Sequence, residues 1–359
     1  MDVGGTVQHR LRRLPGLRLM AGARSPLRRL AERLDAVALR AWEVSTFHLH
    51  RPPSDGAMTA RLRRMGVSGF TAYAAGQMVG HYGRRNFLPA DRGRLVAMLR
   101  ADHADAVETI LATAERLCAG RFALLGSAER DMRRGGDAPG WRIDWQRDPV
   151  SGERYARVFS HWRFDVARMR PGGADIKGPW ELSRAQHLVT LGQAYWLTGD
   201  EAYARCFAGT IEDFIRQNPV GFGVHWACTM DVGLRLVGWL AGLSFFQGSP
   251  HLGLRWWRRF LKSLVEHGNF IVANLEFGTW NGKLVVSNHG VSDLFGLYWL
   301  ALNFPHLDAA CVWRGIAETG LEREAARQIL PDGGDFESSV PYHGLVTEML
   351  LSAYALSLQ

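Results

Sequence analysis

From residue 90 onward, long stretches with helical periodicity alternate with short breaks of glycine, proline and asparagine. Little of this region reads as a strand, because alternating apolar and polar runs are scarce. The predicted helices are 91–119, 180–198, 201–217, 226–246, 254–275, 291–303, 308–330 and 345–356. Most end at a recognisable stop, such as Asn218-Pro219 or Pro331 with the glycines that follow. The pattern predicts an all-α fold class.

The helix predicted over 180–198 is amphipathic, since Leu188, Leu191 and Tyr195 recur along one face. Repeated helices of this length with short connections pack as antiparallel hairpins, which assemble into bundles, solenoids or closed α/α toroids. No fixed-period repeat is present, which argues against a regular solenoid. Two long irregular stretches, 121–179 and 277–287, interrupt the helices, and we expect them to line or cover a cleft.

Charge and composition narrow the classes of partner. The 359 residues are 47% hydrophobic, enough for a buried core, and most of the 13 Trp are expected there rather than against sugar rings. The net charge of +8 favours polyanions such as nucleic acid, membrane headgroups or anionic glycans. Arginine is concentrated in the first 40 residues. We expect a basic, solvated segment over 1–60 and a helical domain over 61–359.

The four cysteines are far apart and form no CxxC or Cys/His ligand spacing, so neither a disulfide scaffold nor a metal site is predicted, and no cofactor is expected. No apolar run is long enough to span a bilayer. The arginine-rich start also lacks the apolar core of a secretory signal. A cytoplasmic location is therefore compatible with the sequence.

Four clusters of polar and aromatic residues stand out in order along the chain. They are Asp175-Ile176-Lys177-Gly178-Pro179-Trp180-Glu181-Leu182-Ser183-Arg184; Asn218-Pro219 through His225-Trp226 with Met230-Asp231-Val232-Gly233-Leu234-Arg235; Ser287-Asn288-His289-Gly290; and Pro331-Asp332-Gly333-Gly334-Asp335-Phe336-Glu337-Ser338-Ser339-Val340-Pro341-Tyr342-His343. Individually each motif is weak. Together, from about residue 115 to 359, they resemble the N-terminal helical domain of the heparinase II/III family of polysaccharide lyases, which is also similar to certain alginate lyases.

The resemblance implies an α/α toroid that cleaves a uronic-acid-containing polysaccharide, of the heparan-sulfate or alginate kind, by β-elimination. The C5 proton of a uronate is hard to remove beside a carboxylate, so a neutral or cationic donor must hold that carboxylate. Asn288 matches the family's asparagine, with His289 beside it as a substitute. Tyr342 matches the family's catalytic tyrosine, which protonates the departing O4 and in some stereochemistries also removes the C5 proton.

Further residues of the matched motifs are candidates for binding an anionic chain. They are Lys177, Trp180, Glu181, Arg184, Trp226, Arg235, Glu337 and His343. Each has a structural alternative: Arg184 can pair with Glu181, Arg235 can pair with Asp231, and both tryptophans can be core.

The three candidate catalytic residues have structural alternatives as well. Asn288 can cap the following helix, His289 can be a satisfied structural histidine, and Tyr342 can pack on a neighbouring hairpin.

Two features depart from the family pattern. Family members often carry His and Arg where this chain has Asp335 to Ser338, and a carboxylate facing an anionic substrate is repulsive unless it is paired. Complete lyases of this kind add a C-terminal β-rich domain that contributes a catalytic histidine, and no strand-rich segment follows the last predicted helix here. The sequence is thus read as a truncated toroid whose β-domain is encoded beyond it or separately. The resemblance implies the periplasm or cell envelope.

Two other functions stay open. An α/α-toroid glycoside hydrolase needs two carboxylates across the scissile bond, and Asp335 with Glu337 is the obvious pair, although residues so close in sequence seldom face each other. The second open function is a non-catalytic toroid that binds acidic glycans in capsule or exopolysaccharide metabolism. Nucleic acid is not an expected partner, because no nucleic-acid motif accompanies the charge.

Overall fold

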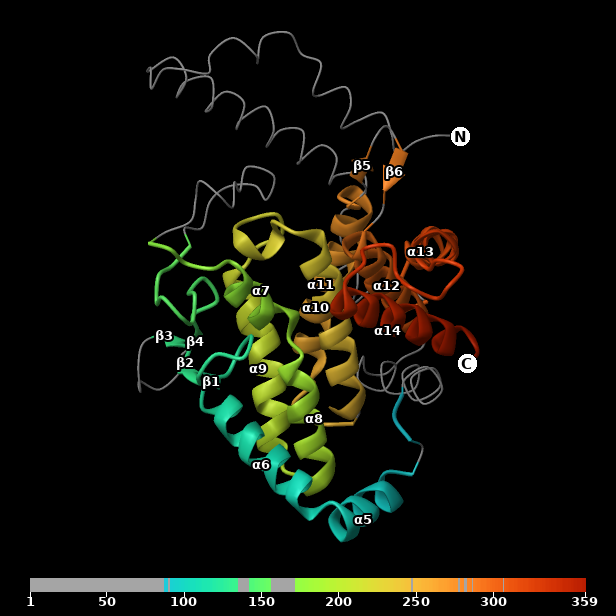
Figure 1. The fold of residues 1–359 in the computed structure, drawn as a ribbon. Helices are drawn as coiled ribbons and strands as arrows, with labels where there is room; N and C mark the ends of the chain where they lie inside the picture. Colours follow the sequence, from blue (N-terminus) through green and yellow to red (C-terminus); the bar gives the residue numbers. More distant parts are fainter. Residues whose placement is uncertain are drawn as a thin grey trace, which may run out of the picture. The chain divides into compact units, whose positions relative to one another are not determined.

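The computed structural model describes residues 87–89, 91–134, 142–155, 172–246, 248–276, 278–280, 283–285, 287–305 and 307–359. The basic segment predicted over 1–60 lies outside the described residues. The helices are α5 (Arg92–Asp102), α6 (Ala104–Cys118), α7 (Lys177–Arg184), α8 (His187–Thr198), α9 (Glu201–Gln217), α10 (Thr229–Leu243), α11 (Leu254–Ala273), α12 (Asn288–Asn303), α13 (Ala310–Gln328) and α14 (Val340–Ser357) (Figure 1). Two 3₁₀ turns, η3 (Val224–Trp226) and η4 (Ser244–Phe246), flank α10. The predicted all-α class is confirmed.

The helices pack as sequential hairpins around α10 and α12, which make the most extensive contact in the described part of the chain. Helix α10 also touches α7, α8 and α11, and α12 also touches α13 and α14. Figure 1 shows α8 and α9 running side by side beneath α7. This arrangement confirms the predicted toroid-type architecture of helical hairpins.

Local signals explain where several helices begin and end. Asp91 and Asp200 accept hydrogen bonds from the backbone of Arg94 and Ala202, and so cap α5 and α9. Gly199 ends α8 in the left-handed region with φ 75°, which glycine adopts without steric cost.

Two predicted helices are each broken in two. The helix predicted over 91–119 divides at His103 into α5 and α6, and the helix predicted over 180–198 divides at Ala185 into α7 and α8. Ala185 adopts φ 61°, which is strained for a residue with a Cβ. Helix α10 passes so close to this bend that a Cβ on Gly238 would overlap the carbonyl oxygen of Arg184. Packing against α10, rather than any local stop signal, accompanies the break.

Short antiparallel hairpins occupy the predicted irregular stretches. The strands are β1 (Arg121–Phe122), β2 (Arg130–Asp131), β3 (Arg133–Arg134), β4 (Arg142–Ile143), β5 (Gly278–Trp280) and β6 (Lys283–Val285), paired β1 with β2, β3 with β4 and β5 with β6. In the last pair Gly278 lies opposite Val285. Parts of both stretches lie outside the described residues, so their role in covering a cleft stays a prediction.

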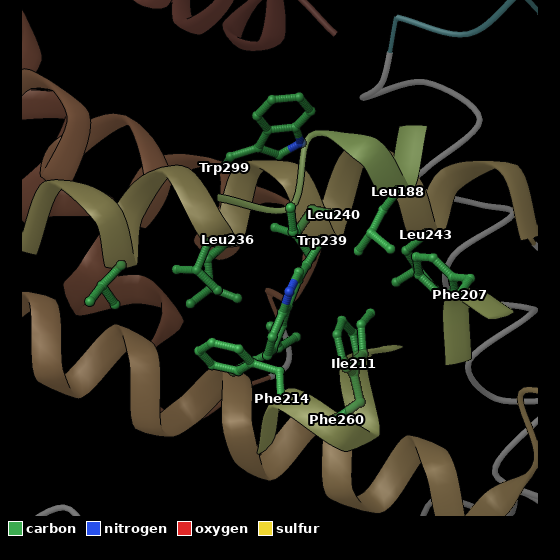
Figure 2. Close-up of a cluster of buried hydrophobic side chains, with 14 of the residues drawn as sticks. Leu188, Phe207, Ile211, Phe214, Leu236, Trp239, Leu240, Leu243, Phe260 and Trp299 are labelled. Atoms are coloured by element: carbon green, nitrogen blue, oxygen red, sulfur yellow. The ribbon is translucent and has the colours of Figure 1, made fainter. Parts of the chain in front are cut away.

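A continuous apolar core joins the hairpins, and aromatic residues dominate it. Figure 2 shows Leu188 of α8, Phe207 and Phe214 of α9 and Trp239 of α10 converging with Phe260 of α11. Several tryptophans are buried in the core, namely Trp145, Trp226, Trp239, Trp256, Trp257, Trp299 and Trp313. Their burial confirms the expected core role for these rings.

Helices α10 and α12 approach each other at a glycine contact. A Cβ on Gly296 would lie 2.5 Å from the carbonyl oxygen of Gly233, and a Cβ on Gly233 would lie 2.6 Å from that of Ser292. No side chain separates the two backbones at this point. The contact fixes the first turns of α12 against α10.

The four cysteines are all free thiols. None of the helices in the described ranges combines the length and hydrophobicity of a bilayer-spanning segment.

Candidate functional site

The candidate site begins at the first turn of α12. Ser287 is the N-cap, with its hydroxyl accepting a hydrogen bond from the backbone of His289 at 3.3 Å. Asn288 is therefore the first helical residue, and the structural alternative that made it the cap is wrong. Its residue surface is only 5% exposed. The N-terminal end of a helix carries partial positive charge and favours anions.

Glu337 is the anion that occupies this helix start. Its carboxylate accepts a hydrogen bond from the Asn288 backbone at 2.7 Å and contacts the Asn288 side-chain nitrogen at 2.9 and 2.8 Å. The side-chain oxygen of Asn288 has no hydrogen-bond partner among the described residues. Glu337 thus holds the amide where the resemblance expects a substrate carboxylate.

His289 forms a second polar pair beside Asn288. Its Nδ1 is in close hydrogen-bond contact with Glu276, which follows α11. That hydrogen bond raises the pKa of His289 despite partial burial. Burial alone would raise the pKa of Glu276, but the hydrogen bond and positive charge of His289 lower it. Both shifts favour the charged His289–Glu276 pair over its neutral form.

Cys228 and two aspartates complete this cluster. The Cys228 sulfur lies 3.7 Å from His289 Nδ1 and 3.9 Å from Glu276 Oε2. Burial and the charges of Asp231 and Glu276 raise the pKa of the Cys228 thiol. Burial and the charge of Glu276 likewise raise the pKa of Asp293 well above its usual range. Acidic groups are therefore crowded around His289, and Cys228, Glu276 and His289 together can offer three metal ligands.

Tyr342 lies in the first turn of α14 and is 47% exposed. Its phenol makes no hydrogen bond within the described part of the chain. Helix α14 packs on α12, where the Ser292 hydroxyl is 3.3 Å from the Met349 sulfur. Because Glu337 precedes α14 and contacts Asn288, the starts of α12 and α14 are linked. The adjacent His343 is half-buried and donates its backbone N–H to Ser339.

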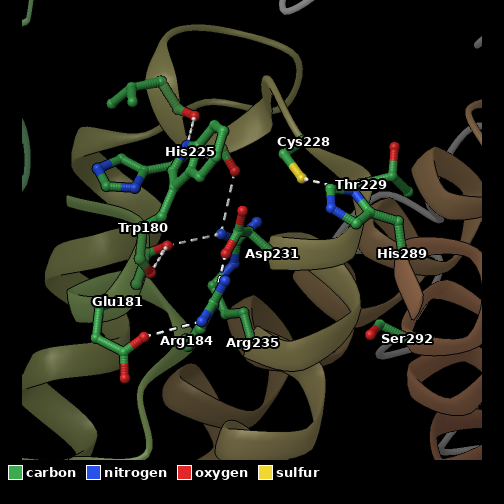
Figure 3. A network of polar contacts seen from close by, with 12 residues as sticks. Trp180, Glu181, Arg184, His225, Cys228, Thr229, Asp231, Arg235, His289 and Ser292 are labelled. Carbon is green, nitrogen blue, oxygen red and sulfur yellow. Dashed lines mark hydrogen bonds and ion pairs between the residues drawn. The ribbon is translucent and has the colours of Figure 1, made fainter. Parts of the chain in front are cut away.

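The motif on α7 forms an ion-pair network with α10, shown in Figure 3. Arg184 donates to Asp231 at 2.7 Å and to Glu181 at 2.9 Å. Burial would lower the pKa of Arg184, but the charge of Asp231, followed by that of Glu181, raises it. The predicted pairing of Arg184 with Glu181 is confirmed. Asp231, suggested as the partner of Arg235, pairs with Arg184 instead.

Arg235 and Trp226 lie in the core behind this network, with exposures of 0% and 1%. The Arg235 guanidinium stacks 4.9 Å from the Trp226 ring and 4.5 Å from Phe214, and donates to His267 at 3.0 Å. Burial lowers the pKa of Arg235 to about 9. Neither side chain reaches solvent, which favours the structural alternative over direct substrate contact for both.

Lys177 and Trp180 are more accessible. Lys177 is exposed at the start of α7, and the indole N–H of Trp180 donates to the carbonyl of Val224 at 2.8 Å while the ring stays partly exposed. Both can contact a ligand approaching α7.

The described surface also has a depression away from these motifs. It has a volume of about 550 Å³ and is lined by α5 and α6, including Arg100, Glu108 and Glu115. None of the candidate residues lines it. It carries no chemistry that the site requires.

The sequence did not indicate three residues of the cluster. Glu276 and Asp293 lie outside every motif, and Cys228 was set aside because no ligand spacing surrounds it. Their partners are 13 to 61 positions away, so only the fold brings them together.

Comparisons with known proteins point to one family. The family model described as heparinase II/III N-terminus matches residues 113–359. A heparin-sulfate lyase of Pedobacter heparinus is 26% identical over 181 residues, which are 49% of this chain and 26% of that protein. A heparin-sulfate lyase of Bacteroides thetaiotaomicron is 25% identical over 173 residues, 47% of this chain and 24% of that protein.

Solved structures are similar in fold. The heparan sulfate lyase HepC of Pedobacter heparinus superposes with a TM-score of 0.59 and 20% identity, over 87% of this chain and 44% of that chain. A mutant of the same lyase gives a TM-score of 0.55 at 21% identity, over 80% and 39%. The chain thus spans less than half of these structures and matches about a quarter of the curated relatives' length.

Proposed function

The chain belongs to the heparinase II/III family, and on that premise we propose that it is the helical part of a polysaccharide lyase. Its substrate is a uronic-acid-containing glycosaminoglycan of the heparan-sulfate kind, which it cleaves by β-elimination. The observation that carries this proposal is the link from Asn288 and His289 at the start of α12, through Glu337, to the start of α14, which bears Tyr342.

Each of these residues has a role in the proposed reaction. Asn288, supported by the partial positive charge of the α12 N-terminus, holds the uronate carboxylate and stabilises the charge that develops when the C5 proton leaves. A base removes that proton, the C4–O4 bond breaks, and a C4–C5 double bond forms. Tyr342 donates a proton to the departing O4, and in the syn stereochemistry its phenolate form first takes the C5 proton and then passes that proton to O4. His289 is the substitute for Asn288.

Substrate binding in this proposal uses the accessible residues of α7 and α14. Lys177 offers a cation to sulfate or carboxylate, Trp180 offers a ring to a sugar face, and His343 lies beside Tyr342. Glu181 and Arg184 pair with each other at 2.9 Å, so they support the α7 edge, and Arg184 contacts substrate only by exchanging partners. An alginate-like substrate stays as the alternative polyuronate.

We also propose that the complete enzyme includes the β-rich domain implied by the family resemblance, with its catalytic histidine. The solved relatives are more than twice the length matched here, which supports a further domain. The boundary between a basic segment over 1–60 and the helical domain is part of the same proposal.

One observation favours a second function, a toroid that binds acidic glycans without cleaving them. Glu337 already engages the Asn288 amide, and a carboxylate at this point opposes an anionic substrate. The hydrolase alternative is weaker, because Asp335 is 5% exposed and accepts a hydrogen bond from the Glu337 backbone at 3.1 Å instead of facing it.

Product chemistry separates the three functions. The enzyme, as its gene encodes it, is incubated with heparan sulfate, heparin and alginate, and both ultraviolet absorbance and new reducing ends are measured. A lyase raises both, because elimination leaves an unsaturated sugar that absorbs. A hydrolase raises reducing ends alone. Retention on a heparin column that salt reverses, without either product, supports the non-catalytic toroid and contradicts the lyase proposal.

A further inference from the structure

Cys228, Glu276 and His289 come from three separate helix ends. Cys228 is the N-cap of α10, Glu276 follows the end of α11, and His289 is in the first turn of α12. The sulfur, a carboxylate oxygen and Nδ1 all lie within 4.8 Å of one another. No sequence spacing predicts this set, because the three residues meet only through the fold.

The two distances from the Cys228 sulfur fit a shared metal ion. Zinc bonds of about 2.3 Å to sulfur and about 2.0–2.2 Å to nitrogen and oxygen place tetrahedral ligand atoms roughly 3.4–3.6 Å apart. The sulfur lies 3.7 Å from His289 Nδ1 and 3.9 Å from Glu276 Oε2. The nitrogen and the carboxylate oxygen are in direct hydrogen-bond contact, closer than two ligands of one ion, so metal binding replaces the shared proton and moves these two atoms apart.

Two buried aspartates beside the three residues each have an oxygen that a cation could neutralise. Asp231 is 1% exposed, and one of its oxygens has no hydrogen-bond partner among the described residues. Asp293 is fully buried, accepts from the Glu276 backbone at 2.8 Å, and likewise has one unpartnered oxygen. The second Asp231 oxygen pairs with Arg184. Buried carboxylates with unused oxygens are costly unless a cation or hydrogen bond satisfies them.

We propose that Cys228, Glu276 and His289 bind a divalent transition-metal ion, with zinc as the best match. A thiolate, an imidazole and a carboxylate are the mixed ligand set that suits this borderline-soft ion, whereas magnesium and calcium prefer oxygen alone. Three protein ligands leave a fourth position for water or for the unpartnered oxygen of Asp231. The ion joins the starts of α10 and α12, and so fixes His289 and the adjacent Asn288.

Cobalt is a direct probe of this site, because a cobalt ion bound by a thiolate absorbs in the near ultraviolet by charge transfer. The full 359-residue chain, prepared with a chelator and then freed of it, is titrated with Co²⁺ and then with Zn²⁺. We expect one equivalent of cobalt to give the thiolate band and zinc to displace it. Zinc should also raise the Tm, because it binds only the folded chain.

Variants of two proposed ligands test where the ion binds. Cys228→Ser should remove the charge-transfer band and weaken zinc binding at least tenfold. Glu276→Gln, which keeps a hydrogen-bonding oxygen, should retain the band with at least tenfold weaker affinity. Cys311→Ser, at an exposed cysteine on α13, is the matched control and should behave as the parent. Absence of stoichiometric uptake, or an unchanged cobalt spectrum and affinity in both Cys228→Ser and Glu276→Gln, would overturn the proposal.

Discussion

Glu337 accepts every hydrogen bond that Asn288 donates, so the charge at residue 337 controls whether the amide is available to a substrate. We expect Glu337→Gln to lower KM for an anionic polysaccharide roughly fivefold, or about 1 kcal/mol, since a like charge is removed at constant shape. Steady-state kinetics measure this. Glu348→Gln, an exposed change on the following helix α14, is the control. An unchanged or higher KM for Glu337→Gln would show that the carboxylate does not oppose the substrate.

His225 makes stability depend on pH. It is fully buried, and burial, followed by the nearby charge of Arg235, lowers its pKa to about 3. The unfolded chain regains the ordinary value of about 6.5, so it binds more protons than the folded chain between these limits. The contribution of His225 to the free energy of unfolding is therefore fully present above pH 6.5. It decreases by about 1.4 kcal/mol per pH unit as the pH falls toward 3.

Replacing His225 should remove this one contribution. His225→Gln keeps a donor for the Trp145 carbonyl. We expect this variant to reduce the dependence of the unfolding free energy on pH between pH 6 and 4 by about 1.4 kcal/mol per pH unit, which corresponds to one proton. Urea denaturation at several pH values measures the slope. His103→Gln, at an exposed histidine between α5 and α6, should leave it unchanged. An equal slope in the parent and His225→Gln contradicts the assignment.

At the residue scale, the sequence indicated which residues form the candidate site but not which of them are buried. Motif order indicated Asn288, His289 and Tyr342, and the structure links the helix starts that carry them. The sequence could not show whether Trp226 and Arg235 are buried or bind substrate at the surface. A charged residue within an apolar helix gives the same sequence pattern in both cases. Only the rings packed around Arg235 reveal that it is internal.

The elements that position the site are α10 and α12, which meet at Gly233 and Gly296. We expect Gly296→Ala to destabilise the fold by about 1–3 kcal/mol, because the new methyl group meets backbone that cannot move aside. Chemical denaturation gives the free energy. The matched control is Gly209→Ala on α9, where a Cβ meets nothing within 4 Å and helix propensity should add about 0.5–1 kcal/mol. Equal effects of the two substitutions would contradict the close contact.

Helix existence and type followed from periodicity and from glycine, proline and asparagine stops. The positions at which two helices break could not be predicted from these signals. The sequence around Ala185 contains no stop, yet the helix ends there in a left-handed residue where α10 crosses closely. Tertiary packing overrides local propensity at such a bend. The short hairpins, including β5–β6, were equally invisible, since strands of two or three residues leave no periodic signal.

For the whole molecule, the family match and the fold agree with the sequence prediction, and the net charge of +8 suits an acidic glycan. The sequence placed the site residues in order but could not show that Glu337 would engage Asn288, because that contact spans 49 positions. The proposed reaction therefore requires that the starts of α12 and α14 act together on one uronate.

The most direct test is elimination by the enzyme, as its gene encodes it, with Tyr342→Phe. The proposed role predicts a loss of about 10²- to 10⁴-fold in kcat on heparan sulfate, because the phenol proton is gone while the ring remains. Tyr354→Phe, at an exposed tyrosine of the same helix, should retain full activity. Release of unsaturated product at the parent rate by Tyr342→Phe would contradict the account.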